Sequence, residues 1–290
     1  MTRRLFLVLI ALAIYAGGAL PWSAVGAASP HRIVSLVPST TEMLFAMGQG
    51  NRLIGVGNYD TYPPETRRLP KLGGLLDPDV ERILSLKPDL AILYSTQVEL
   101  RRQLDRVGIP TFAYVHRGLP DITDTIRKLG ARIDAAPPAN ALADRLEGQL
   151  AAIRARVAGR PRPKTLLVIG REAGSLRGVF ASGGDGFLHD MLEAAGASDA
   201  LGDIKRESVQ MSTEMILSRA PEVIFELHYG RDLKPERLEP ERDVWNRLGS
   251  LRAVKTHRVY LLVGDEFVVP GPRVVAATER LARTLHPERF

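Results

Sequence analysis

Short apolar runs alternate with amphipathic segments along the first half of the chain. Apolar runs predict buried strands over 31–37, 53–56, 90–93 and 111–115. The intervening segments predict helices from a cap at Thr40 or Thr41 to Met47, and over 79–86, 98–107 and 122–133. This alternation is typical of an α/β fold in which a mostly parallel sheet is covered by helices on both faces.

The pattern changes in the middle of the chain and then resumes. Residues 139–157 form one long amphipathic segment, with Leu142, Leu146, Leu150 and Ile153 at helical spacing. Beyond it we expect strands over 165–169, 223–226 and 259–263, and helices over 187–195, 213–219 and 274–285.

Two segments of the chain resemble each other. Residues 80–88 and 213–221 both contain Glu, Ile-Leu-Ser and Pro at the same spacing, which places Glu81 and Glu214 133 residues apart. Such a repeat indicates two similar lobes. We therefore predict two Rossmann-like lobes with parallel sheets, joined by one long interlobe helix, with a ligand cleft between them. A single stiff connector also predicts little closure on binding.

The predicted boundaries follow from these patterns. We assign residues 31–136 to an N-terminal lobe, 137–160 to the connecting helix and 161–290 to a C-terminal lobe. Residues 1–27 read as a signal peptide, because Arg3 and Arg4 precede an apolar run and small residues follow at 25–27. The apolar run is short for a membrane anchor, which needs about 20 residues. The sequence thus predicts export to the periplasm.

Composition excludes several kinds of chemistry. The chain has no cysteine, so disulfides, thiolate metal sites, cysteine nucleophiles and a cysteine-linked lipid anchor are excluded. The formal net charge is +6, with basic and acidic residues interleaved. This distribution indicates a solvated surface and no nucleic-acid partner.

Catalytic signatures are missing from the sequence. It contains no G-x-S-x-G elbow, no P-loop and no H-E-x-x-H motif. Asp185 with His189, and Asp265 with Glu266, are the pairs on which a secreted α/β enzyme would depend. The first pair has no matching nucleophile. Adjacent residues on an extended segment point to opposite faces, so only one residue of the second pair could enter the cleft. We expect a protein that is not an enzyme. His116 and His228 each follow a strand-like run, where parallel sheets face a ligand crevice, and are alternative metal ligands.

Several stretches together resemble class III periplasmic binding proteins, which serve ABC importers of cobalamin, ferric siderophores and haem. They are residues 32–42, 62–64, 81–88 and 245–260. Val37-Pro38-Ser39-Thr40-Thr41-Glu42, and Tyr59 preceding Tyr62-Pro63-Pro64, are most similar to the cobalamin-binding branch. The resemblance implies a monomer without an intrinsic cofactor, which delivers a corrinoid to a permease dimer driven by a cytoplasmic ATPase.

The resemblance also implies roles for individual residues. Tyr59 would lie against the corrin ring, Phe180 and Asp265 would line the opposite lobe, and Tyr94 is a further candidate. The family's tryptophans are replaced near Gly74-Leu75 and at about Ser208, and Trp245 looks like a packing residue. Haem or a ferric siderophore is therefore the alternative ligand, with Tyr59, His116 or His228 as the iron ligand in the case of haem.

The repeated glutamates match the family's docking residues. Glu81 and Glu214 correspond to the acidic residue that each lobe presents to arginines of the importer. Two carboxylates at equivalent places on two lobes can pair with a symmetric permease dimer. Such charge pairs determine the orientation of docking more than its affinity.

Overall fold

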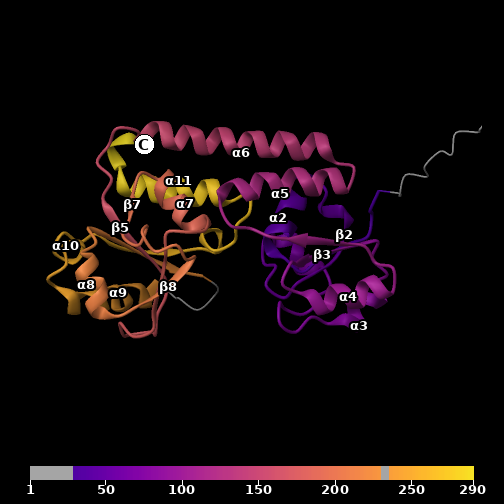
Figure 1. Cartoon of the computed structure of the whole chain (residues 1–290), viewed down its shortest axis with the longest axis horizontal. Coiled ribbons are helices and arrows are strands. Elements are labelled where there is room, and N and C mark those ends of the chain that lie inside the picture. Colours follow the sequence, from indigo (N-terminus) through magenta and orange to yellow (C-terminus); the bar gives the residue numbers. More distant parts are fainter. Residues whose placement is uncertain (1–28, 230–234) are drawn as a thin grey trace, which may run out of the picture.

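Two α/β lobes lie side by side, and one long helix runs along the same edge of both (Figure 1). The structure is a computed structural model that describes residues 29–229 and 235–290. The predicted signal peptide lies outside the described residues. No helix in the described ranges has the length and apolarity needed to cross a bilayer.

The first lobe is built on a parallel sheet. Its strands, as far as the chain is described, have the order β2-β1-β3-β4: β1 Ile33–Ser35, β2 Leu53–Val56, β3 Leu90–Tyr94 and β4 Thr111–Tyr114. The helices of this lobe are α2 Pro38–Ala46, α3 Val80–Ser85, α4 Val98–Arg106 and α5 Leu119–Arg132, with short 3-10 turns η1 Gly50–Arg52 and η2 Pro64–Arg68. The central strands β1 and β3 are almost fully buried, which explains their continuous apolar runs.

The sheet of the second lobe is mixed. Its order is β10-β9-β5-β6-β8, with β7 paired to β5. The strands are β5 Lys164–Gly170, β6 Val179–Ser182, β7 Ser198–Asp199, β8 Ser208–Met211, β9 Val223–His228 and β10 Val259–Val263. Strand β6 runs antiparallel to both β5 and β8, so the expectation of parallel strands holds fully only in the first lobe. Strands β6 to β8 were not predicted, because they are short and lie in a stretch rich in turn formers.

Helices cover the second sheet as expected for an α/β fold. They are α7 Phe187–Ala194, α8 Thr213–Arg219, α9 Pro235–Asp243, α10 Arg252–Lys255 and α11 Val274–Leu285, with 3-10 turns η3 Val244–Leu248, η4 Asp265–Phe267 and η5 Pro287–Arg289. Helices α7 and α11 lie between this sheet and the long connecting helix in Figure 1.

The long helix α6, Ala136–Val157, packs on both lobes. It contacts α5 of the first lobe and α7 and α11 of the second. One continuous apolar cluster passes from β1 through these helices to β9, and it includes the predicted positions Leu142, Leu146, Leu150 and Ile153. The helix begins before the predicted start at residue 139, because Pro137 and Pro138 are tolerated in a first turn.

Helix α2 begins earlier than predicted. We expected Thr40 or Thr41 to cap it, but Val37 is the residue before the first turn, and Pro38 occupies that turn. Proline favours this position because its missing N–H is not needed there. The Thr40 hydroxyl instead donates to the carbonyl of Val37 at 2.9 Å and lies 3.0 Å from the Ser35 hydroxyl.

The internal repeat is visible in the backbone. Helices α3 and α8 have N-caps 133 residues apart, Asp79 and Ser212, and each side chain accepts a hydrogen bond from the backbone N–H three residues on. Lys87 and Ala220, again 133 apart, both have left-handed φ values, 49° and 48°. The two segments therefore begin and end in the same way.

The contact between α5 and α6 depends on a glycine. A Cβ atom on Gly130 would lie 2.1 Å from Cβ of Ala139. We predict that Gly130→Ala lowers the free energy of unfolding by about 1–3 kcal/mol, because overpacking outweighs the better helix propensity. Gly148 is an exposed glycine of α6 with nothing within 4 Å of an added Cβ, so Gly148→Ala should stabilise by up to about 1 kcal/mol. Urea unfolding measures the change in the free energy of unfolding for each variant. Equal changes for Gly130→Ala and Gly148→Ala would contradict this prediction.

Candidate functional site

Two cavities adjoin where the lobes face each other. One, of about 290 Å³, is lined by Tyr59 and Thr61 from the first lobe and by Tyr229 and Asp265 from the second. The other, of about 260 Å³, lies within the first lobe beside Tyr59. Tyr59 borders both cavities, and the residue is 75% exposed. We call these two cavities together the interlobe cleft.

Backbone hydrogen bonds position the loop that carries Tyr59. The N–H of Asn58 donates to the carbonyl of Gly73 at 2.8 Å, and the Asn58 side-chain oxygen accepts from the N–H of Gly73 at 3.2 Å. Gly73 has φ of 85°, and an added Cβ would lie 2.2 Å from the carbonyl oxygen of Asp77. Glycine is therefore required where the two loops meet.

Of the four residues predicted to contact ligand, three line the interlobe cleft. Asp265 borders the cavity shared by the lobes, Tyr94 borders the one in the first lobe, and Tyr59 borders both. Phe180 is 45% exposed on β6 but lines neither cavity.

A partly buried ion pair joins the lobes at the cleft. Arg273, just before α11, donates from Nε to Oε2 of Glu42 at 2.9 Å and from Nη2 to Oε1 at 2.5 Å. The guanidinium also lies 4.2 Å from the ring of Tyr62. Burial raises the pKa of the Glu42 carboxyl, although the arginine opposes this shift. Sequence reasoning missed the pair, because its members are 231 residues apart; the only signal was a glutamate within an apolar helix.

Further polar contacts cross between the lobes. The Tyr114 hydroxyl donates to the carbonyl of Pro270 at 3.3 Å, and the N–H of Leu119 donates to Oδ2 of Asp190 at 2.8 Å. The Thr61 hydroxyl donates to Oδ2 of Asp265 at 3.2 Å. Together with α6, these contacts fix how the walls of the interlobe cleft face each other.

Asp60 places a buried carboxyl group in the cleft wall. The residue is 1% exposed and lines the cavity of the first lobe. Neither carboxyl oxygen has a well-aligned hydrogen-bond partner among the described residues. Burial raises the pKa of Asp60 to about 7, and the nearby Thr41 hydroxyl and Lys71 ammonium only partly oppose the shift. The Asp60 carboxyl is thus partly protonated, and so partly uncharged, near neutral pH.

His116 packs among aromatic rings near the end of β4. Its ring stacks on Tyr114 with centroids 5.4 Å apart and meets the edge of Phe187 at 5.8 Å. Burial lowers the pKa of the imidazole. His116 does not line either cavity of the interlobe cleft.

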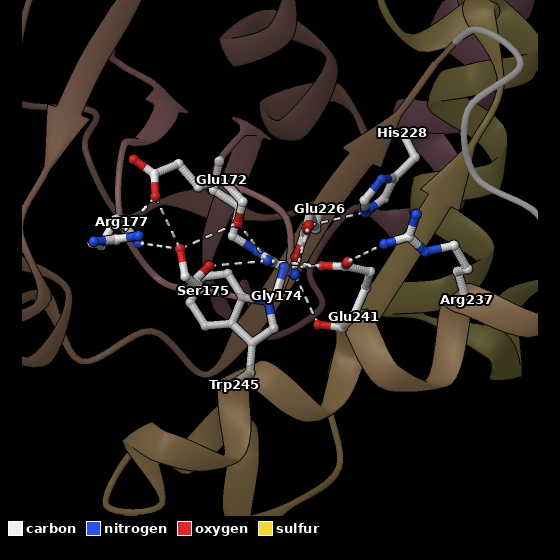
Figure 2. A network of polar contacts seen from close by, with 10 residues as sticks. Glu172, Gly174, Ser175, Arg177, Glu226, His228, Arg237, Glu241 and Trp245 are labelled. Carbon is white, nitrogen blue, oxygen red and sulfur yellow. Dashed lines mark hydrogen bonds and ion pairs between the residues drawn. The ribbon is translucent and has the colours of Figure 1, made fainter.

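His228 belongs to a buried polar cluster at the end of β9. Its Nε2 lies 2.9 Å from Oε1 of Glu226, whose side chain is 2% exposed. Figure 2 shows His228 and Trp245 approaching Glu226 from opposite sides. The indole N–H of Trp245 donates to Oε2 of Glu226 at 2.6 Å, and the residue is fully buried, as a packing role predicts. The signal for this cluster was a glutamate inside an apolar strand.

The two residue pairs considered for an enzyme do not form catalytic units. His189 Nδ1 lies 2.8 Å from Oδ2 of Asp199, so its carboxylate partner is Asp199 and not Asp185. Asp265 lines the cleft, whereas Glu266 contacts the guanidinium groups of Arg273 and Arg280 at 3.6 and 3.5 Å.

Glu81 and Glu214 occupy equivalent places on the two lobes. Each is exposed at the second position of its short helix, α3 or α8. Figure 1 shows both helices in the half of the molecule away from α6. Hydrogen bonds from its own backbone and from Ser212 lower the pKa of Glu214, so this carboxylate stays ionised at neutral pH.

Comparison with known proteins agrees with this architecture. Residues 33–265 match the family model described as periplasmic binding protein. The chain is 30% identical to the uncharacterized ABC transporter substrate-binding lipoprotein YvrC of Bacillus subtilis (strain 168), over 90% of this chain and 82% of the relative. It is 28% identical to the vitamin B12-binding protein of Salmonella typhimurium, over 98% of each chain.

Solved structures share the fold. The vitamin B12-binding protein BtuF of Vibrio cholerae superposes with a TM-score of 0.77 at 23% identity, over 90% of this chain and 98% of that chain. The periplasmic heme-binding protein RhuT of Roseiflexus sp. RS-1, in its apo form, superposes with a TM-score of 0.75 at 26% identity, over 90% of this chain and 99% of that chain. The family consists of solute-binding proteins of ABC transporters, not enzymes. The chain belongs to the periplasmic binding protein family.

Proposed function

We propose that the protein binds a corrinoid, cobalamin or a close relative, in the interlobe cleft and delivers it to an ABC permease dimer. The exposed ring of Tyr59, bordering both cavities, carries this proposal. A flat macrocycle gains much of its affinity from aromatic contact. The Salmonella relative named for vitamin B12 extends over nearly the whole chain, which supports the assignment.

The proposal includes the route and the partners. Residues 1–27 would direct export to the periplasm, residues 31–136 and 161–290 would form the two walls of the binding site, and 137–160 would connect them. The protein would act as a monomer, and its carboxylates Glu81 and Glu214 would meet the permease. A cytoplasmic ATPase would drive release of the ligand, which is cargo and not a cofactor.

Haem is the second candidate, because the Tyr59 phenol is exposed in the cleft. A phenolate oxygen is a known haem-iron ligand. His116 and His228 are poorer candidates, since His116 is enclosed by aromatic rings and His228 contacts Glu226. A ferric siderophore would use the same cleft without requiring a protein ligand.

Two substitutions of one residue separate these ligands. We expect Tyr59→Ala to weaken cyanocobalamin binding by about tenfold to a hundredfold, because a stacking surface is removed. Tyr59→Phe should keep corrinoid affinity within about threefold, since the ring remains. If haem is the ligand, Tyr59→Phe should instead shift the Soret band and weaken hemin binding. Calorimetry with both compounds is the measurement, and no saturable cyanocobalamin binding by the wild type would refute the corrinoid proposal.

A further inference from the structure

The second lobe contributes an aromatic residue to the cavity that the two lobes share. Tyr229 follows β9 directly, and it lines this cavity together with Tyr59 and Tyr62 of the first lobe. It is 53% exposed. Sequence reasoning expected Phe180 on this side of the cleft, but Phe180 lines neither cavity of the interlobe cleft. The structure thus brings a different aromatic residue of the second lobe to the cleft.

Contacts at the end of β9 hold the backbone beside Tyr229. The carbonyl of His228 accepts a hydrogen bond from the N–H of Gly264 at 2.9 Å, and the His228 ring contacts Glu226 (Figure 2). Strand β9 lies between β5 and β10, and both run parallel to it. Ligands of α/β proteins bind in the crevice outside the carboxyl ends of such strands. Tyr229 occupies that position.

The three tyrosines that line the shared cavity differ in what they already contact. The guanidinium of Arg273 lies 4.2 Å from the ring of Tyr62, and the same guanidinium pairs with Glu42. Tyr59 and Tyr229 make no hydrogen bond, ion pair or ring contact within the described part of the chain. Tyr62 is therefore part of the contact between the lobes, whereas Tyr59 and Tyr229 have ring surface available for a ligand.

Tyr229 also borders a cavity within the second lobe, but the charged groups of that cavity are paired with one another. Nη2 of Arg171 lies 3.1 Å from Oε1 of Glu226, and Nη1 lies 2.9 Å from Oε2 of Glu241. The shared cavity instead has the apolar residues Val268 and Val269 in its lining. An apolar ligand surface therefore gains more in the shared cavity.

A flat macrocycle has two faces, and one tyrosine ring covers part of one face only. An aromatic side chain buries about 150–250 Å² when it is fully covered, so a second ring adds a comparable contact. We propose that Tyr229 is the aromatic contact of the second lobe for a flat macrocyclic ligand, which it holds together with Tyr59. This assignment rests on the proposed function, because it requires a flat ligand in the interlobe cleft.

Three substitutions test this role by calorimetry with cyanocobalamin. We expect Tyr229→Ala to weaken binding by at least about tenfold, because it removes the ring. Tyr229→Phe keeps the ring and should stay within about threefold of wild type. Phe180→Ala is the matched control, because it removes an exposed ring of the same lobe that lines neither cleft cavity. It should bind like wild type, and thermal unfolding shows whether each variant is folded.

A cross-linking experiment tests the placement of Tyr229 without any ligand. The chain has no cysteine, so Tyr59→Cys combined with Tyr229→Cys introduces a single pair of thiols. A short bifunctional maleimide should join them, because both positions line one cavity of about 290 Å³. Tyr59→Cys combined with Gly148→Cys is the control pair, since Gly148 is exposed on α6, and it should not cross-link within the monomer.

The outcomes separate this assignment from the corrinoid proposal. If wild type binds cyanocobalamin but Tyr229→Ala binds like wild type, or loses no more affinity than Phe180→Ala, the assignment of Tyr229 is overturned and the corrinoid proposal stands. If wild type binds hemin and not cyanocobalamin, the corrinoid proposal falls, and a tenfold loss of hemin affinity in Tyr229→Ala supports the assignment. No cross-link between positions 59 and 229 would also overturn it, as would a wild type that binds neither macrocycle.

Discussion

Replacing both Glu81 and Glu214 by lysine should abolish uptake in cells and leave ligand affinity of the purified protein within about twofold of wild type. Both carboxylates are exposed at equivalent positions of α3 and α8, and neither lines the interlobe cleft. Lysine would place positive charge against the arginines expected on the permease, and like-charge juxtaposition at an interface costs several kcal/mol. Ligand-dependent growth measures uptake, and calorimetry measures affinity.

The control variant for this prediction changes the net charge by the same amount as the Glu81 and Glu214 double variant. Glu99 is exposed at the second position of α4, the same place in its helix, and Glu288 is exposed near the chain end. Glu99→Lys with Glu288→Lys should transport normally. The docking role is excluded if the Glu81 and Glu214 double variant transports like this control, or if its ligand affinity falls along with uptake.

Replacing Asp60 by asparagine should change how stability depends on pH. The pKa of Asp60 is about 7 in the folded protein, against 3.8 for an unperturbed side chain. The folded state therefore holds a proton that the unfolded state has lost between these pH values, and wild-type stability falls as pH rises. The difference corresponds to about 4 kcal/mol across this window. Asparagine does not ionise. The free energy of unfolding of Asp60→Asn, relative to that of wild type, should therefore rise by about that amount from pH 4 to pH 8.

Urea unfolding at several pH values measures this difference. Asp105→Asn, an exposed substitution of the same kind, should follow the wild-type pH dependence. The prediction is wrong if the free energies of unfolding of wild type and Asp60→Asn change in parallel from pH 4 to pH 8. That result would show that burial does not raise the pKa of the Asp60 carboxyl.

Local sequence patterns predicted most of the regular structure. The bounds of β2 match the prediction, and the repeat correctly paired α3 with α8, because capping and left-handed turns are local properties. Strands β6 and β8 were missed, since they pair antiparallel across a turn-rich stretch with little periodicity. Short strands of this kind depend on neighbours that no local pattern reveals.

Contacts between distant residues explain what sequence reasoning missed at the site. The Glu42–Arg273 pair and the Arg171–Glu226 contact each join separate parts of the chain. Their sequence signals were only acidic residues in apolar surroundings. Phe180 lines neither of the two cleft cavities, and β6, the strand that carries it, was not predicted from the sequence.

Helix α6 packs along both lobes, and this affects how the protein would serve as an optical sensor. Its 22 residues extend about 33 Å, and the ion pair and the other polar contacts at the cleft also join the lobes. Energy transfer between dyes on opposite lobes should therefore change little when cargo arrives. A single environment-sensitive dye at Leu76, which is 93% exposed beside the cleft residue Leu75, should report occupancy far better.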